Sequence, residues 1–346
     1  MTAPTLADRA TGIDQIAIRE MYELANARGG DLVRLEIGEP DFDTPEHVLD
    51  AADEAARGGA THYTSNAGIP ELREAIAEKT ERDHGLAVDP DAVVAAAGAT
   101  EAILLTLLAT AEPGDEVVIP TPCWPQYRLQ TQLVGASPVE VPLAAEDGFD
   151  LDADRVIDAM GPATSAVLLN SPSNPTSRCY DPDAVARVAA AAAEHDAHVL
   201  LDEVYASLDF AGDGRSLAAD LDADNVVVIN ACSKQYAMTG WRLGWLIASP
   251  PLVEAATTLH PGTSTCASSV SQHAGVAALS GPQAPAERMH EAFRERAGTT
   301  WSTGWPTSRG SRPRRPRAAS TRSSTSARSM GRATRSPSGC SPSTAS

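Results

Sequence analysis

The sequence is poor in lysine, in regularly spaced cysteines and in long apolar runs. No run of 18 apolar residues occurs in the 346 residues, and a membrane-spanning helix needs about 20 of them, so we expect no membrane partner. The first eight residues, Met1 to Asp8, also lack the basic and apolar regions of a secretory signal peptide. These absences predict a cytoplasmic protein.

The cysteines follow no pattern that is typical of a metal site. Five are present, an odd number, and no two have the spacing Cys-x-x-Cys: they are Cys123, Cys179, Cys232, Cys266 and Cys340. Such a scattered set predicts neither a disulfide framework nor a bound metal, and it favours a reducing compartment.

The charge is divided unevenly along the chain. Residues 1–297 contain all 46 acidic residues and 18 of the 27 basic ones, whereas residues 298–346 contain nine arginines and no acid. The formal net charge is therefore −28 in the first part and +9 in the second. The acidic part disfavours nucleic acid and anionic membranes as partners, and we hypothesise that it suits a cytoplasm of high salt.

The last 49 residues differ from the rest in composition as well as in charge. Residues 298–346 contain no Leu, Ile or Val, and 21 of them are Ser or Thr. Such a segment cannot bury enough apolar surface to fold, so we expect disorder there. A change of reading frame near residue 297 is one hypothesis for this tail, and a genuine basic arm for nucleic acid or acidic partners is the alternative.

Lysine occurs twice, at positions 79 and 234. Lys234 follows the apolar run 226–229, which predicts a buried parallel strand, and open α/β sheets have their sites beyond the carboxyl ends of such strands. An ε-amine can condense with an aldehyde, and a neighbouring cation such as Arg242 helps to keep it deprotonated. The alternative for Lys234 is a solvated loop lysine.

Two other strand ends have residues that suit ligand binding. Gly98-Ala99-Thr100 separates an apolar strand from a helix, a position where unpaired N–H groups attract phosphate, although the same residues also cap ordinary helices. Asp202 ends the strand that begins at residue 198, and a buried carboxylate there needs a cationic partner such as a pyridinium N–H. An acidic residue after a strand is also typical of metal and Walker-B sites, but no GxxxxGK[ST] segment precedes it.

These segments resemble, in order and spacing, the class I/II aminotransferases, fold type I pyridoxal-phosphate enzymes of the aspartate aminotransferase type. The resemblance rests on the Ser233–Gly244 segment, on Gly38-Glu39-Pro40-Asp41-Phe42, on the segment 63–73, on Asn174-Pro175-Thr176 and on Asp202-Glu203-Val204-Tyr205. It implies an α/β fold with a mostly parallel, doubly wound sheet in a large domain, 45–280, and an incomplete small domain. The small domain would comprise residues 1–44 and 281–297, with 298–346 as an aberrant tail.

The resemblance implies a role for individual residues around pyridoxal 5′-phosphate. Lys234 would bind the cofactor and then act as the base that moves a proton from the substrate. Asp202 would face the ring nitrogen, Trp124 would stack on the ring, and Asn174 and Tyr205 would bind its 3′-oxygen. Gly98, Ala99, Thr100, Ser233 and Arg242 would bind the phosphate, together with Tyr63 of a neighbouring subunit, and Gly38, Trp124 and Asn174 would contact the substrate. Trp124 could instead be a core residue, and Tyr63 an ordinary packing residue.

The implied activity is transfer of an amino group from an L-amino acid to a 2-oxo acid by a ping-pong mechanism in a homodimer. A carbon–sulfur lyase of the same fold and an inactive truncated product are the alternatives. The chain departs from the family at Ser177, where the family has glycine. If this position needs φ > 0, we expect serine to strain the turn by about 1 kcal/mol without abolishing it. No arginine of the tail matches the family residue that binds the substrate α-carboxylate.

Overall fold

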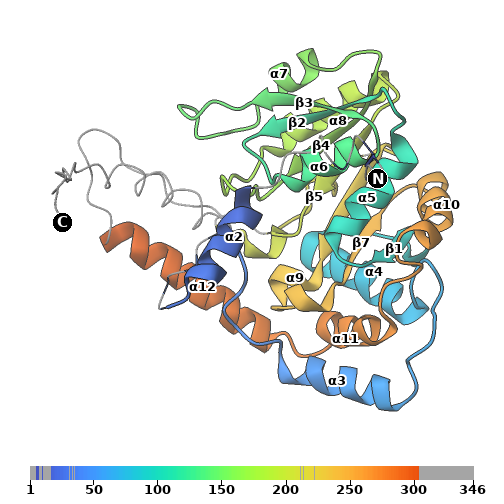
Figure 1. Ribbon diagram of the computed structural model, residues 1–346, viewed down its shortest axis with the longest axis vertical. Coiled ribbons are helices and arrows are strands. Elements are labelled where there is room, and N and C mark those ends of the chain that lie inside the picture. Colours follow the sequence, from blue (N-terminus) through green and yellow to red (C-terminus); the bar gives the residue numbers. More distant parts are fainter. Residues whose placement is uncertain are drawn as a thin grey trace, which may run out of the picture.

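In the computed structural model, the described residues are 5–7, 10, 17–30, 32, 34, 36–210, 212, 214–221 and 223–303. Seven strands form one sheet at the centre of the molecule (Figure 1), in the order β1-β7-β6-β5-β4-β2-β3. The strands are β1 Val93–Ala96, β2 Glu116–Thr121, β3 Ser137–Pro142, β4 Thr164–Asn170, β5 His198–Asp202, β6 Val226–Ala231 and β7 Gly244–Ile247. β7 is antiparallel to both of its neighbours, β1 and β6, and the remaining pairs are parallel. The predicted mostly parallel sheet is confirmed.

Helices cover both faces of the sheet because alternate strand residues point to opposite sides. One face packs against α5 Ala99–Thr110, α6 Gln126–Leu133 and α10 Pro250–Leu259. The other face packs against α3 Glu46–Arg57, α4 Pro70–His84, α7 Ala153–Asp158, α8 Pro182–Glu194 and α11 Ser269–Ser280. Within β5, for example, Val199 and Leu201 belong to one core and Leu200 to the other.

Local signals in the sequence fix the ends of several helices. Asp181 accepts a hydrogen bond from the N–H of Asp183 at the start of α8, and Pro182 occupies the first helical position. Gly85 ends α4 in the left-handed conformation, with φ at 68°. Short pieces complete the fold: η1 Pro90–Ala92, η2 Ala206–Leu208, α9 Cys232–Gln235, η3 Thr239–Trp241 and η4 His260–Gly262.

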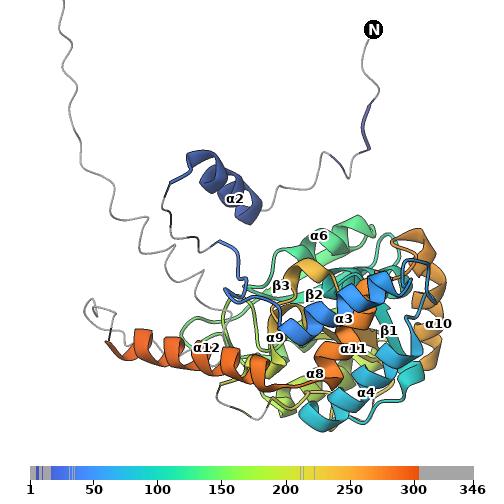
Figure 2. The ribbon, with the colours of Figure 1, turned by 90° about the horizontal axis from the view of Figure 1, so that it is seen from below.

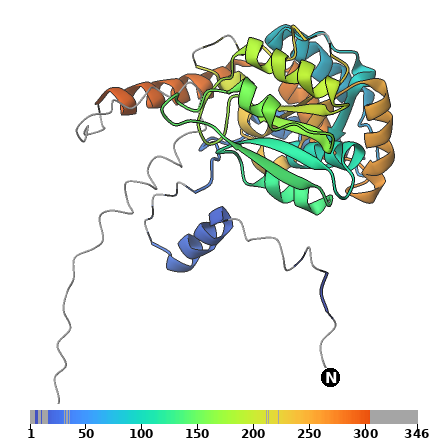
Figure 3. The ribbon, with the colours of Figure 1, turned by 90° about the horizontal axis from the view of Figure 1, so that it is seen from above.

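Two helices extend away from this body. α2 Ala17–Arg28 is separate from the sheet and its covering helices, and α12 Ala284–Thr303 runs outward from them (Figures 2 and 3). None of the helices in the described part of the chain is long and apolar enough to cross a membrane. The tail beyond Thr303 lies outside the described residues.

Candidate functional site

The carboxyl edge of the sheet brings together residues from five segments of the chain. β1, β2, β4, β5 and β6 run in the same direction, so the segments that follow them emerge on one side. Asn170, the last residue of β4, is in register with Asp202, the last residue of β5. Lys234 lies on α9, directly after β6. Parallel strands thus place an amine and a carboxylate, 32 residues apart in the sequence, at one edge.

The amine of Lys234 is held at the loop that precedes α3. Its Nζ donates a hydrogen bond of 2.6 Å to the carbonyl oxygen of Gly38 and lies 5.9 Å from the centre of the Tyr205 ring. Burial lowers the pKa of the Lys234 amine below its usual value; Glu39 opposes this shift and Arg242 adds to it. A lowered pKa leaves more of the amine unprotonated and able to react near neutral pH.

Asp202 is a buried acid with a limited set of partners. Its side chain is 2% exposed; Oδ2 accepts a hydrogen bond of 2.6 Å from the hydroxyl of Tyr127, and Oδ1 accepts one of 3.2 Å from the N–H of Val204. Burial raises the pKa of the Asp202 carboxyl to about 6, against the lowering effect of these two hydrogen bonds. No arginine or lysine forms an ion pair with Asp202 within the described part of the chain, so a cationic group of a ligand would be a favourable neighbour.

Asn174 and Tyr205 lie in contact with each other, and Tyr205 is close to both the amine and the acid. The N–H of Asn174 donates a hydrogen bond of 2.6 Å to the side-chain oxygen of Asn170, which fixes the loop after β4. Burial raises the pKa of the Tyr205 hydroxyl, and a hydrogen bond with the Asn174 side chain opposes this effect. An amide and a hydroxyl in contact can bind a phenolic oxygen. Ser177 in the same loop has φ at 55°, so the condition for the expected strain at this turn is met.

The turn from β1 into α5 provides donors for a phosphate. Gly98 has φ at 89°, and a Cβ atom at that position would lie 2.5 Å from Nη2 of Arg242, so only glycine leaves room for the guanidinium. Arg242 donates hydrogen bonds to the carbonyl oxygens of Ala97 at 3.2 Å and Thr239 at 2.9 Å. The first N–H groups of α5, those of Ala99 and Thr100, have no partner within their own helix.

Trp124 and Tyr63 lie in different surroundings. Trp124 is half-buried after β2, and its ring meets that of Tyr127 edge to face, with the ring centres 5.4 Å apart. Tyr63 lies on the loop between α3 and α4 with 87% of its surface exposed. Among the described residues, no hydrogen bond or ring contact joins Tyr63 to the cluster at the sheet edge, so in a single chain this predicted residue stands apart.

Sequence reasoning missed Tyr127. The signal that could have identified it is its place three residues after Trp124 in the first turn of α6, where it can approach the end of β5. It also missed a buried group next to the phosphate turn. Glu101 accepts hydrogen bonds from the N–H of Ala97 at 2.5 Å and from the hydroxyl of Ser264 at 3.0 Å, and it pairs with His260 at 3.3 Å.

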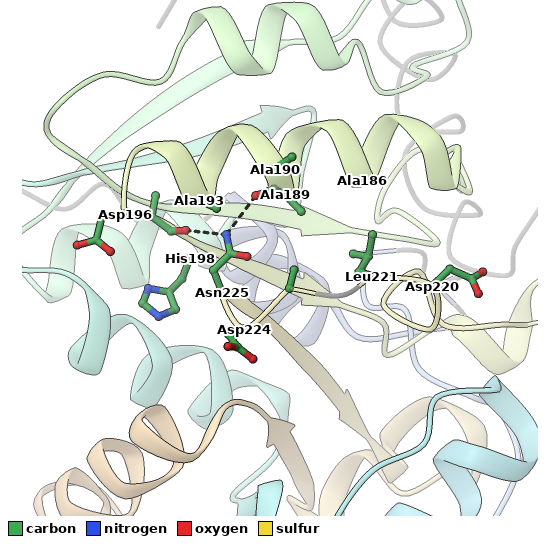
Figure 4. Close-up of a pocket in the computed structure, with 12 residues that line it drawn as sticks. Ala186, Ala189, Ala190, Ala193, Asp196, His198, Asp220, Leu221, Asp224 and Asn225 are labelled. Carbon is green, nitrogen blue, oxygen red and sulfur yellow. Dashed lines mark hydrogen bonds between the residues drawn. The ribbon is translucent and has the colours of Figure 1, made fainter.

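A hollow opens at the opposite end of the strands. Its volume is about 620 Å³, and it lies between α8, the start of β5 and the segment before β6 (Figure 4). Alanines of α8 form much of its wall, and the Asn225 side chain is tied to the carbonyl oxygens of Ala189 and Ala197. With a wall formed largely of alanine side chains, this hollow has fewer features of a reactive site than the carboxyl edge.

The residues at the carboxyl edge fit pyridoxal phosphate. The amine of Lys234, with its lowered pKa, suits the aldehyde, and the buried acid Asp202 suits the ring nitrogen. The hydroxyl–amide pair of Tyr205 and Asn174 suits the 3′-oxygen. The turn at Gly98, next to the Arg242 guanidinium, suits the phosphate. No group of three or more His, Cys, Asp or Glu among the residues that the structure describes could hold a metal ion.

Comparisons with known proteins agree with this chemistry. Residues 30–299 match the family model described as aminotransferase class I and II. The aspartate aminotransferase of Geobacillus stearothermophilus is 37% identical over 284 residues, which cover 81% of this chain and 72% of that protein. The aspartate/prephenate aminotransferase of Thermus thermophilus is 38% identical over 272 residues, which cover 78% of this chain and 70% of that protein.

Solved structures give the same result. The aspartate aminotransferase of Thermus thermophilus with maleate superposes with a TM-score of 0.80 at 35% identity, over 86% of this chain and 79% of that one. The alanine aminotransferase of Pyrococcus furiosus superposes with a TM-score of 0.81 at 30% identity, over 91% of this chain and 82% of that one.

Proposed function

The chain belongs to the class I and II aminotransferases, enzymes that depend on pyridoxal phosphate, and from this membership we propose that Lys234 is the residue that binds the cofactor and moves the proton. When bound, the cofactor supplies an electron sink for negative charge on the substrate Cα. The observation that supports the assignment best is the Lys234 amine itself, which has a lowered pKa and lies at the loop of Gly38. With a substrate bound, the Lys234 amine would be the base that takes the Cα proton.

Asp202 orients and tunes the cofactor ring. Its carboxylate would face the ring nitrogen and favour the protonated ring, which is the stronger electron sink. Asn174 and Tyr205 would donate hydrogen bonds to the 3′-oxygen, and the flat face of Trp124 would cover the ring. These assignments are supported by the burial of Asp202 and by the contact between Asn174 and Tyr205.

The phosphate would bind at the start of α5. Gly98, Ala99 and Thr100 would offer backbone and side-chain donors, and Ser233 and Arg242 would complete the binding site from the Lys234 segment. The conformation of Gly98, which leaves space for the Arg242 guanidinium, supports this assignment.

We infer that the substrates are an acidic L-amino acid and a 2-oxo acid. Several similar proteins are named aspartate aminotransferase, which supports aspartate as the amino donor. The backbone of Gly38 would contact the substrate, with Trp124 and Asn174 beside it. Measuring amino-group transfer from a panel of amino donors to 2-oxoglutarate tests this; an enzyme that prefers an uncharged donor to aspartate would contradict it.

The active unit would be a homodimer in which Tyr63 contributes to the phosphate site of the neighbouring subunit. The large exposed fraction of the Tyr63 side chain supports this proposal, since a tyrosine usually buries its ring. A reducing compartment, the cytoplasm, would suit the four described cysteines, which form no disulfide with one another. We also propose the division into a large domain, 45–280, and small-domain parts, 1–44 and 281–297, because the sheet and its covering helices end with α11 at Ser280.

The scarcity of lysine makes the covalent assignment testable by labelling. Borohydride reduction of the protein with pyridoxal phosphate, followed by peptide mapping, should label Lys234. Lys79 is the internal control, because it is 3% exposed and paired with Asp83. The variant Lys234→Ala should show neither the label nor the yellow absorbance that pyridoxal phosphate has when it is linked to lysine. A label on Lys79 or on the N-terminus alone would contradict the proposal.

A further inference from the structure

Tyr127 contacts two groups of the proposed site at once. Its hydroxyl donates a 2.6 Å hydrogen bond to Oδ2 of Asp202, and the two side chains are 1% and 2% exposed, so water does not compete with this bond. On the other side, its ring meets the Trp124 ring at an interplanar angle of 84°. Edge-to-face contact of this kind restrains the orientation of both rings.

The position of Tyr127 is itself fixed by α6. The hydroxyl of Thr131 donates a hydrogen bond of 2.9 Å to the carbonyl oxygen of Tyr127. One turn further along, Nε2 of Gln130 donates one of 2.5 Å to the carbonyl oxygen of Thr100, in the turn proposed for the phosphate. α6 therefore holds Tyr127 at a set distance from the start of α5.

Asp202 needs the hydrogen bond from the Tyr127 hydroxyl, because the one it accepts from the N–H of Val204 is weaker. The N–H of Val204 approaches Oδ1 at 3.2 Å, which is a long hydrogen bond, and no cationic side chain among the described residues lies in ion-pair contact with the carboxylate. A hydrogen bond from a neutral hydroxyl favours the ionised carboxylate but leaves its remaining lone pairs free. The carboxylate can then accept a further donor, such as a ring N–H.

From these contacts we propose that Tyr127 is a positioning residue of the reaction. Its hydroxyl keeps Asp202 ionised and directed at the cofactor ring. Its own aromatic ring fixes the orientation of Trp124, which covers the cofactor. This inference rests on the proposed function, since Asp202 and Trp124 act only if the cofactor binds at Lys234. Without the hydroxyl, the proton that Asp202 shares with the ring nitrogen shifts toward the carboxylate. The ring then has less positive charge and is a poorer electron sink.

The variant Tyr127→Phe removes the hydroxyl and keeps the ring. We expect covalent attachment at Lys234 to persist and the dissociation constant of pyridoxal phosphate to change less than about threefold. We expect kcat to fall at least about tenfold with little change in KM, because the lost interaction acts on the transition state. The pH at which the absorbance of the bound cofactor titrates should move upward, since a less positive ring withdraws fewer electrons from its linkage to lysine.

Tyr236→Phe is the matched control. Tyr236 is also 1% exposed, and its hydroxyl donates a 2.8 Å hydrogen bond to the side-chain oxygen of Gln283, which is not one of the proposed site residues. This variant should lose a comparable amount of thermal stability and keep the kcat and the titration pH of the parent. A second variant, Tyr127→Leu, also removes the contact with Trp124, and cofactor affinity should then fall at least about tenfold.

The outcomes separate the two proposals. If the parent protein forms a lysine-linked chromophore but Tyr127→Phe has the same kcat and the same titration pH as the parent, the role of Tyr127 is wrong and the proposed function stands. If the parent itself forms no such chromophore with pyridoxal phosphate, both proposals are overturned.

Discussion

At the scale of single residues, backbone conformation and burial determine which side chains are replaceable. Gly98 has a φ that other residues rarely adopt, and Arg242 occupies the space that a side chain would need. Asp202 and Tyr127 are buried as a hydrogen-bonded pair, so removing either one leaves a polar atom of the other without its partner. The sequence pattern predicted both Gly98 and Asp202 as site residues, because Gly98 follows an apolar strand and Asp202 ends one.

We predict that Gly98→Ala weakens cofactor binding by at least about tenfold. The backbone of Gly98, with φ at 89° and ψ at 169°, costs a residue with a Cβ atom about 1–3 kcal/mol, and the new methyl group would displace Arg242. A spectroscopic titration with pyridoxal phosphate measures the effect. Gly161→Ala is the control, since no atom lies within 4 Å of its added Cβ; equal affinities in the two variants would contradict the prediction.

At the scale of elements, one buried ion pair joins three segments around the phosphate turn. His260 in η4 is completely buried, and its Nδ1 bonds the carbonyl oxygen of Asn66 at 2.7 Å while its Nε2 faces Glu101 in the first turn of α5. Asn66 belongs to the loop that presents Tyr63. The start of α5, η4 and this loop are therefore held together by charged groups.

The pH dependence of stability should reveal this pair. Despite burial, hydrogen bonds from His260 and from the N–H of Ala97 lower the pKa of the Glu101 carboxyl to about 2, from 4.5. Its contribution of about 3 kcal/mol is therefore present above pH 4.5 and is lost as the pH falls toward 2. The pKa of His260 is raised above 6.5 by Glu101 and Asn66, against burial, so its contribution is lost as the pH rises through that higher value.

Urea unfolding at a series of pH values tests this dependence. The difference in free energy of unfolding between the parent and Glu101→Gln should be largest between pH 4.5 and 6.5 and should shrink on both sides. A difference that stays constant from pH 3 to pH 8 would show that the pair is not ionised in the folded protein.

A second element-scale contact connects α12 to the loop of Gly38. Phe293 meets Phe42 edge to face with ring centres 5.4 Å apart, and Arg296 donates hydrogen bonds to both carboxylate oxygens of Asp41 at 2.7 and 2.9 Å. The same loop accepts the hydrogen bond from Lys234, so α12 steadies the segment proposed to contact the substrate.

We predict that Phe293→Ala raises the KM for the amino donor several-fold and changes kcat less than about twofold, since it loosens a binding loop and leaves the reacting groups in place. Steady-state kinetics with the amino donor provide the measurement. Arg294→Ala, which removes an exposed pair with Glu291 on the same helix, serves as control. An unchanged KM in Phe293→Ala would show that the loop is held without α12.

At the scale of the whole molecule, the acidic composition predicts a response to salt. The formal net charge is −19, and the acids are confined to residues 1–297. Mutual repulsion of these charges opposes the compact state and is screened by added salt. We predict that molar KCl stabilises the protein by about 2 kcal/mol, or about 4–8 °C in Tm at neutral pH.

Calorimetry or a thermal fluorescence scan measures the shift. Near pH 4.7, the isoelectric point of the sequence, the net charge vanishes and the gain from KCl should be much smaller. An equal gain at both pH values would point to a cause other than charge screening.

The sequence predicted the architecture well wherever one local signal was sufficient. Apolar strands that alternate with helices indicated a mostly parallel sheet, and glycine, aspartate and lysine at strand ends predicted a site at its carboxyl edge. Contacts between distant segments had no such signal. Tyr127 and Asp202 are 75 residues apart, and nothing in either segment specifies that they meet. The segment 33–37 alternates like a strand, but its described residues Arg34, Glu36 and Ile37 are not in one, since a strand also needs a pairing partner.

By itself, then, the sequence determined the type of each element and the residues with reactive groups, because side-chain chemistry, apolar periodicity and turn residues are local properties. Only the tertiary structure decided which of those groups meet. It inserted β7 antiparallel between β1 and β6 and so brought Arg242 over Gly98, and it buried Asp202 against Tyr127. The physical reason is that pKa values, hydrogen bonds and close approaches depend on neighbours in space, and packing of the whole chain selects those neighbours.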